Sequence, residues 1–167
     1  MAANDLALHT PSVTLDGALT FKVTSNSTGS SGSQGNILPG EPVTKVAGAA
    51  GVLAAATNAP TTTLRIVGVA ATQSTETASV DGTVEVIVAR QNQRWLIAPK
   101  VAATWNTQAK YNALIGARVL IDNTAGVYTL LASDGASNGC VVEYIDIARY
   151  PGLVAFSFNN IVNYANV

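Results

Sequence analysis

Two β-patterned runs joined by a Thr- and Ser-rich connector constrain the fold of this chain more than any other feature. The runs occupy residues 64–70 and 83–89, and Asp81-Gly82 marks a turn directly before the second one. In the second run, valines alternate with Thr, Glu and Ile, so only one of its two faces is fully apolar. This alternation is typical of an antiparallel strand with one face buried and one face in solvent. The connector lacks helical character, and nothing in the region suggests catalysis.

The rest of the chain repeats this pattern of short β-type runs separated by turn residues. Further strands are expected at residues 12–15, 18–24, 44–47, 94–97, 118–121, 127–131, 140–148 and 152–158. Such spacing predicts a sandwich or a small barrel, and no fixed-period repeat points to a propeller or solenoid. The predicted fold is therefore all-β: a compact antiparallel β-barrel or sandwich of about 8–10 short strands, with one short helix and an extended N-terminal arm.

Turn residues set the boundaries of several of these elements. Pro39-Gly40 suits the centre of a type II turn, because Pro fixes φ and Gly accepts a positive φ. Asp16-Gly17 and residues 122–126 each predict a hairpin. Residues 106–116 form the best helix candidate, with Asn106 as N-cap and Gly116 as the left-handed residue after the C-cap, although an irregular loop is the alternative. Residues 48–59, rich in small side chains, are ambiguous between strand, loop and helix.

Composition divides the chain into three parts. Residues 26–36 consist only of Gly, Ser, Thr, Asn and Gln, a tract that cannot bury apolar surface. This tract is interpreted as a linker or a loop. It separates residues 1–25, an N-terminal arm or hairpin, from a β domain over residues 37–167.

The small number of charged residues indicates which kinds of partner to expect. Charged residues make up 11% of the 167 residues, against about 25% in a typical soluble domain. A surface of Thr, Ser, Asn and Gln loses little on desolvation and suits extensive protein contact. The net charge is −1, without a basic patch, so no nucleic-acid partner is expected. No apolar run reaches the roughly 18–20 residues of a membrane span, and no signal peptide is evident, so we expect no membrane partner and synthesis in the cytoplasm.

Few residues could carry out catalysis or bind a metal. The single cysteine, Cys140, is expected to be a small buried residue in a strand, and the single histidine, His9, lies in the arm. One His and one Cys do not make a zinc site. A carboxylate pair such as Glu85 with Glu143 is conceivable for acid–base chemistry, but nothing in the sequence brings the two together. We therefore expect no catalytic residues, no metal and no cofactor.

Large aromatic residues are the candidates for contact between subunits. Trp95, Trp105 and Tyr111 are predicted to mediate self-association, because aromatic anchors dominate interfaces. Burial in the core is the alternative for the two tryptophans, and a platform for stacking sugar rings is a further one.

Several short segments carry a resemblance to a known family. They are I-L-P-G-E-P-V at 37–43, I-V-G-V-A at 66–70, D-G-T-V-E-V at 81–86, G-A-R-V-L-I at 116–121 and G-C-V-V-E-Y-I-D-I at 139–147. Together with the Thr- and Ser-rich connector they resemble tailed-bacteriophage capsid decoration (cement) proteins over about two-thirds of the chain, residues 37–147. The resemblance implies a β domain, often trimeric, on the outer face of an icosahedral shell, with an N-terminal arm that reaches neighbouring capsid subunits. It carries no catalytic residues over.

The expected function follows from this resemblance. It is a structural virion protein, without enzymatic activity, that binds the outer capsid surface and bridges neighbouring subunits. The partners are the major capsid protein and other copies of the chain, with a homotrimer favoured. The capsid-contact candidates in the arm are Leu6, Leu8, His9, Val13 and Leu15. The alternative is a carbohydrate-binding or host-adhesion β module on a virion surface.

Overall fold

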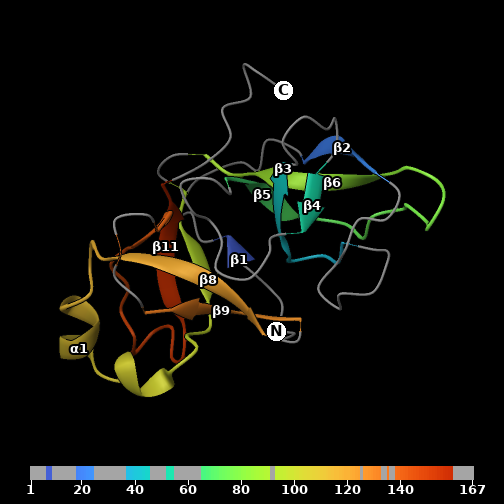
Figure 1. Ribbon diagram of the computed structural model, residues 1–167. Coiled ribbons are helices and arrows are strands. Elements are labelled where there is room, and N and C mark those ends of the chain that lie inside the picture. Colours follow the sequence, from blue (N-terminus) through green and yellow to red (C-terminus); the bar gives the residue numbers. More distant parts are fainter. Residues whose placement is uncertain are drawn as a thin grey trace.

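Two antiparallel sheets form this computed structural model, and one of them is curled into a half-barrel (Figure 1). The structure describes residues 7–8, 18–24, 37–45, 52–54, 65–90, 93–124, 126–132, 135 and 138–159. Within these residues there are eleven strands and one short α-helix. The all-β prediction is therefore confirmed, including its single short helix. Most of the predicted N-terminal arm lies outside the described residues.

The six-stranded sheet has the order β1-β7-β11-β10-β8-β9. Its strands are β1 (Ala7–Leu8), β7 (Trp95–Ile97), β11 (Val154–Phe158), β10 (Cys140–Val142), β8 (Arg118–Thr124) and β9 (Val127–Leu131). Strands β8 and β9 form a tight hairpin, and β10 and β11 are also consecutive in the chain, whereas β1, β7 and β11 come together from distant parts of the sequence. The sheet therefore depends on long-range pairing.

The five-stranded sheet has the order β2-β6-β5-β3-β4. Its strands are β2 (Leu19–Val23), β6 (Gly82–Val88), β5 (Ile66–Ala70), β3 (Pro42–Lys45) and β4 (Val52–Ala54). The alternation predicted for β6 is observed, because Val84 and Val86 are buried while Thr83 and Glu85 are exposed. The run before the connector differs, since all five residues of β5 are buried.

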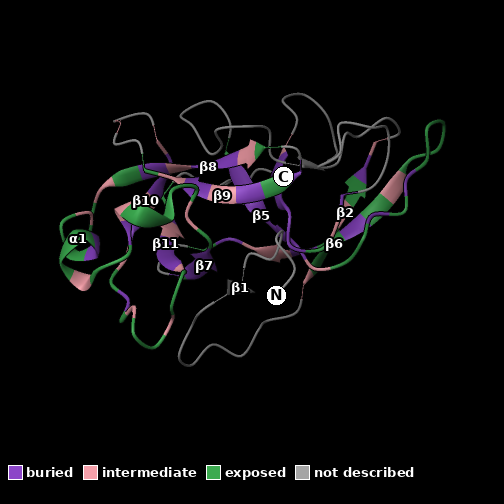
Figure 2. Cartoon of the chain, turned by 90° about the horizontal axis from the view of Figure 1, so that it is seen from below, coloured by how far each residue is buried: buried purple, intermediate pink, exposed green. Residues whose placement is uncertain are grey.

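The central strand β5 is buried because it supplies side chains to both hydrophobic clusters of the molecule. Ile66 and Val69 belong to the cluster that fills the six-stranded sheet, whereas Val67 and Ala70 belong to the smaller cluster of the five-stranded sheet. Burial is continuous along β5 in Figure 2 and alternates along β6. Gly68 of β5 allows the backbones of β5 and β6 to lie close together, because a Cβ at this position would collide with the carbonyl oxygen of Ile87.

Local turn chemistry was predicted well. Gly40 has a φ of 84°, and the Glu41 N–H donates to the Leu38 carbonyl, which closes the type II turn centred on Pro39-Gly40. The hairpin predicted around residues 122–126 is present. Its first strand runs further than expected, to Thr124, and Gly126 adopts a φ of 85°.

Two elements are several residues shorter than predicted. The run at residues 140–148 forms a strand only over β10, because Asp146 then accepts backbone N–H bonds from Ala148, Arg149 and Tyr150 and turns the chain. The helix α1 (Gln108–Asn112) is shorter than residues 106–116 and is capped by Thr107 instead of Asn106. Gly116 does have the predicted positive φ, at 83°.

Strand β2 belongs to the folded body. It pairs along its whole length with β6, and its residue Val23 is fully buried in the smaller cluster. Residues 19–23, which the sequence analysis assigned to an arm or hairpin, are therefore part of the five-stranded sheet. The candidate arm is therefore limited to the residues before Ala18. The predicted strand at 12–15, the turn at Asp16-Gly17 and the tract at 26–36 lie outside the described residues.

Candidate functional site

A lobe at one end of the molecule contains both helical segments. It consists of η1 (Ala102–Thr104), a 3-10 turn, and α1, which lie together beyond the strands of the six-stranded sheet (Figure 1). Its exposed residues include four alanines as well as polar side chains, and Val101 and Ile115 are 54% and 43% exposed.

Tyr111 fixes this lobe to the sheet. Its hydroxyl donates to the carbonyl oxygen of Glu143 at 2.8 Å and accepts from the Ala155 N–H at 2.9 Å. The ring is fully buried, and burial raises the pKa of the Tyr111 hydroxyl to about 12. The phenol therefore stays protonated at neutral pH, and it remains a donor within the core.

Gln108 makes a second connection between α1 and the sheet. Its side-chain amide donates to the Ile145 carbonyl at 3.1 Å, and its oxygen accepts from the Ile147 N–H at 3.1 Å. The segment that follows β10 is thereby held against the helix. Because two polar side chains of α1 bond to backbone groups, the lobe has a defined position relative to the sheet.

The predicted self-association residues lie in the core instead of on the surface. Trp95 and Tyr111 are fully buried and Trp105 is 4% exposed. The Trp95 ring packs edge-on against Phe158, and the Trp105 ring packs edge-on against Tyr111 at 5.4 Å. These side chains fill space within the chain, so the structure gives them no surface for self-association. The same burial removes the exposed ring face that a sugar-stacking platform needs.

One of the capsid-contact candidates falls within the described residues. Leu8 lies in β1, opposite Trp95 of β7 in the strand register. Leu6, His9, Val13 and Leu15 lie outside the described residues. The N-terminal segment thus contributes an edge strand to the six-stranded sheet, next to β7.

A pocket that the sequence analysis missed opens beside the lobe. Its volume is about 250 Å³, and it lies between the η1 turn and the segment that leads into β11. The lining residues are Pro99, Ala102, Trp105, Asn106, Ile147, Pro151, Gly152 and Leu153. These two stretches are about 45 residues apart in the sequence, so no local pattern could have brought them together.

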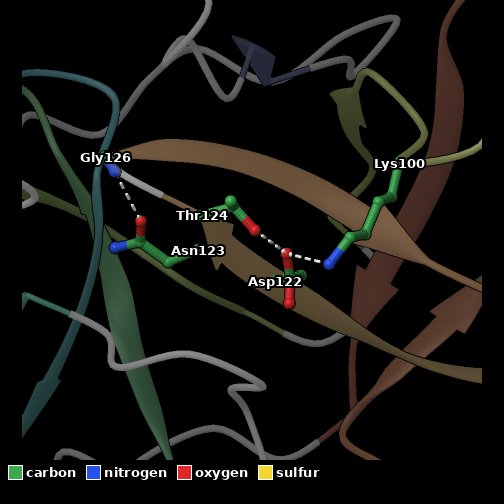
Figure 3. A network of polar contacts seen from close by, with 5 residues as sticks. All are labelled: Lys100, Asp122, Asn123, Thr124 and Gly126. Atoms are coloured by element: carbon green, nitrogen blue, oxygen red, sulfur yellow. Dashed lines mark hydrogen bonds and ion pairs between the residues drawn. The ribbon is translucent and has the colours of Figure 1, made fainter.

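A polar network supports the neighbouring β8–β9 hairpin (Figure 3). Lys100 Nζ donates to Asp122 Oδ2 at 2.8 Å, and the hydroxyl of Thr124 donates to the same oxygen at 2.7 Å. The bond from Lys100 is the main reason that the pKa of Asp122 lies below its ordinary value of 3.8. Asn123 Oδ1 accepts from the Gly126 N–H and closes the turn. We interpret this network as structural support.

The carboxylates weighed as an acid–base pair belong to different sheets. Glu85 is exposed on β6, whereas Glu143 follows β10 and accepts from the Ser157 hydroxyl at 2.7 Å. Among the described residues, no group of three or more His, Cys, Asp or Glu could hold a metal ion. Cys140 is fully buried in β10, as predicted, and burial raises the pKa of its thiol well above the ordinary value.

Comparisons of the chain with protein-family models, curated proteins and solved structures gave no match. In the part of the chain that the structure describes, no helix is long and apolar enough to cross a membrane.

Proposed function

We propose that this protein is a structural virion component that binds the outer surface of an icosahedral phage capsid and ties neighbouring capsid subunits together. It acts by non-covalent bridging and without catalysis. Its partners are the major capsid protein and further copies of itself, for which a trimer is favoured. The protein is made in the cytoplasm of a bacterial host and functions on the virion. The support comes from the sequence resemblance, from the low charge and from one observation in the fold.

That observation is the behaviour of the N-terminal segment. Ala7 and Leu8 add a strand to β7 at the edge of the six-stranded sheet, whereas the next strand of the chain, β2, belongs to the other sheet. Strand addition gives affinity through main-chain hydrogen bonds and makes little demand on side chains. A segment that adds itself to a sheet edge within its own chain has the chemistry to do so on a neighbouring subunit.

The surface chemistry fits the same role. With 11% charged residues, the chain has few of the ionised groups that cost the most free energy when an extensive contact desolvates them. Many copies on one shell bind multivalently, so each contact need only be weak. An expanded shell with seams between capsomers would gain stability from many such bridges.

The test is co-sedimentation of the protein with expanded, undecorated capsids of the virus that encodes it. The full chain is compared with a chain that begins at Ala18, which keeps β2 in its sheet. We expect saturable binding by the full chain and about a tenfold or greater loss without residues 1–17, equivalent to about 1.4 kcal/mol or more.

Circular dichroism and thermal melting of both chains control for folding. Absence of binding by the folded full chain would contradict the capsid proposal. Equal binding by both chains would leave capsid binding in place but assign it to the β domain instead of the N-terminal segment. No observation favours the carbohydrate-binding alternative, since Trp95 and Trp105 are buried.

A further inference from the structure

The outer edge of β7 is covered by a very short strand of the same chain. On one side, all three residues of β7 pair with β11. On the other side, the described residues pair β7 with β1 only through Trp95 and Leu96. An edge strand presents a row of backbone N–H and C=O groups to any segment that can pair with it. The outer edge of β7 is therefore a site for strand addition.

The strand register identifies the segment that this edge accepts. Ala7 lies opposite Leu96 and Leu8 lies opposite Trp95, and the two strands are antiparallel. Every copy of the chain contains both the edge and the segment that fits it. A second copy therefore needs no new surface for this contact, because it repeats a pairing that exists within each chain. Exchange of an identical element between copies is a low-cost route to association.

Strand β1 can leave its sheet while β2 keeps its place. All five residues of β2 pair with β6, and Val23 is fully buried, so the five-stranded sheet holds the chain from Leu19 onward. Release of β1 breaks a pairing of only two residues with β7. Elements held by few contacts are the ones that open most readily in a folded protein.

The connection between the two strands is long enough for exchange. Ten residues separate Leu8 from Leu19, and an extended chain of that length spans about 35 Å. The segment can therefore reach the sheet edge of an adjacent copy. In an assembly that holds copies side by side, the segment of a neighbour and the chain's own segment are both tethered near the edge, so they compete at similar effective concentrations.

We propose that the outer edge of β7 is the acceptor site for residues 7–8 of a second copy of the chain, and that neighbouring copies are linked by exchange of β1. The proposal rests on the self-association part of the proposed function and names the contact that makes it. Its test uses no capsid, so exchange between copies and binding to the capsid can fail independently of each other.

The test is a proton–nitrogen NMR experiment on the isotope-labelled, wild-type full chain. The probe is a synthetic peptide of residues 1–17 in which Thr10→Cys carries a nitroxide, which broadens the amide signals of nearby residues. The peptide is used at millimolar concentration, because the chain's own β1 competes at an effective concentration of about that size. We expect a saturable loss of the β7 amide signals and no loss of those of β6, which lies in the other sheet.

Two control peptides carry the same nitroxide. In the first, Ala7→Pro and Leu8→Pro remove both backbone N–H groups that the segment can offer to β7. In the second, the residues of the segment are present in scrambled order. Neither peptide should reduce the β7 signals, because the first lacks the donors for strand pairing and the second lacks the sequence that fits the edge.

A second experiment detects exchange between full chains. One chain carries Ala7→Cys and the other carries Leu96→Cys, so a disulfide between the two introduced residues can form only between chains. Residues paired in register lie within disulfide range, so we expect about tenfold more heterodimer than when the second chain carries Ala103→Cys, at an exposed position outside the sheet. The native Cys140 is fully buried in each chain. Thermal melting establishes that the variants are folded.

The proposal is wrong if the β7 signals keep their intensity at every peptide concentration, or if either control peptide reduces them as strongly as the native segment does. It is also wrong if the folded Leu96→Cys chain gives no more heterodimer than the Ala103→Cys chain. If Leu96→Cys does not fold, the NMR experiment on the wild-type chain decides by itself.

Discussion

At two glycines of this fold, the space around the Cβ position and the backbone φ decide whether a larger residue is tolerated. Gly68 lies in β5 against β6, and the nearest atom that a Cβ there would meet is the backbone carbonyl oxygen of Ile87. A backbone atom cannot move aside as a flexible side chain can. Gly116 presents the opposite case, since it has a φ of 83° but nothing within 4 Å of an added Cβ.

Gly68→Ala should therefore destabilise the protein more than Gly116→Ala. Overpacking in a core costs about 1–3 kcal/mol or more, whereas a left-handed backbone costs a non-glycine residue about 1–2 kcal/mol. Urea unfolding of the two variants and the wild type measures both losses. Equal losses, or a larger loss at Gly116, would show that the sheet accommodates the extra methyl group.

Asp122 should make the stability depend on pH in the acid range. Because its folded-state pKa is below 3.8, the carboxylate stabilises the fold above that value and loses this contribution as pH falls through the folded-state pKa. The Lys100 side chain is 41% exposed, so solvent screens the pair and we expect about 1 kcal/mol at neutral pH.

The free energy of unfolding of the wild type and Asp122→Asn, measured from pH 7 to pH 2, tests this expectation. The variant should be less stable at pH 7, and the difference should shrink as the pH falls through the folded-state pKa of Asp122. If the difference in the free energy of unfolding stayed constant down to pH 2, the shape of the Asp122 side chain, and not its charge, would account for the lower stability of the variant.

At the scale of elements, the short helix α1 depends on tertiary contacts. Five residues are too few for a helix to be stable alone, since isolated helices below about 12–15 residues are marginal in water. Thr107 caps the first turn, while Tyr111 and Gln108 bond to backbone groups of the sheet and of the segment after β10. The position of the lobe, and with it one wall of the pocket, follows from these bonds.

Tyr111→Phe should loosen the lobe while the sheets persist. The change leaves the buried Ala155 N–H and the Glu143 carbonyl without their shared partner, at a cost of about 1–3 kcal/mol. Hydrogen exchange should rise in α1 before it rises in β8 or β11. Tyr144→Phe is the matched control, because Tyr144 is 55% exposed, and it should change stability by less than about 0.5 kcal/mol.

At the scale of the molecule, the two hydrophobic clusters share β5, so the sheets are expected to unfold together. Strand β2 covers one edge of the smaller cluster, where Val23 is fully buried beside Val84 and Val86. In Figure 2 most of α1 is exposed, whereas β5 and β7 are buried along their length.

Removal of β2 should therefore damage the fold, and removal of the residues before it should not. A chain that begins at Ala18 is expected to melt within a few degrees of the full chain. A chain that begins at Ile37 loses the burial of Val23, worth about 1.5–3 kcal/mol, together with the whole pairing to β6. The melting temperatures of the three chains test this prediction. Equal stability of the two shortened chains would contradict the assignment of β2 to the core.

The sequence alone determined what depends on neighbouring residues. Alternation identified β6, Pro39-Gly40 identified a turn, and Cys140 was correctly expected to be a buried strand residue. These features follow from local backbone preferences and from the two faces of a strand, which a short stretch of sequence specifies.

Only the tertiary structure decided which distant segments meet. It buried Trp95, Trp105 and Tyr111 within the chain, gave β2 a place in the sheet, and formed the pocket from Pro99 to Asn106 with residues 147–153. Tryptophan has the same size and polarity in a core as in an interface, so its residue type does not specify which one it occupies. That choice depends on long-range packing summed over the whole chain, which no local pattern encodes.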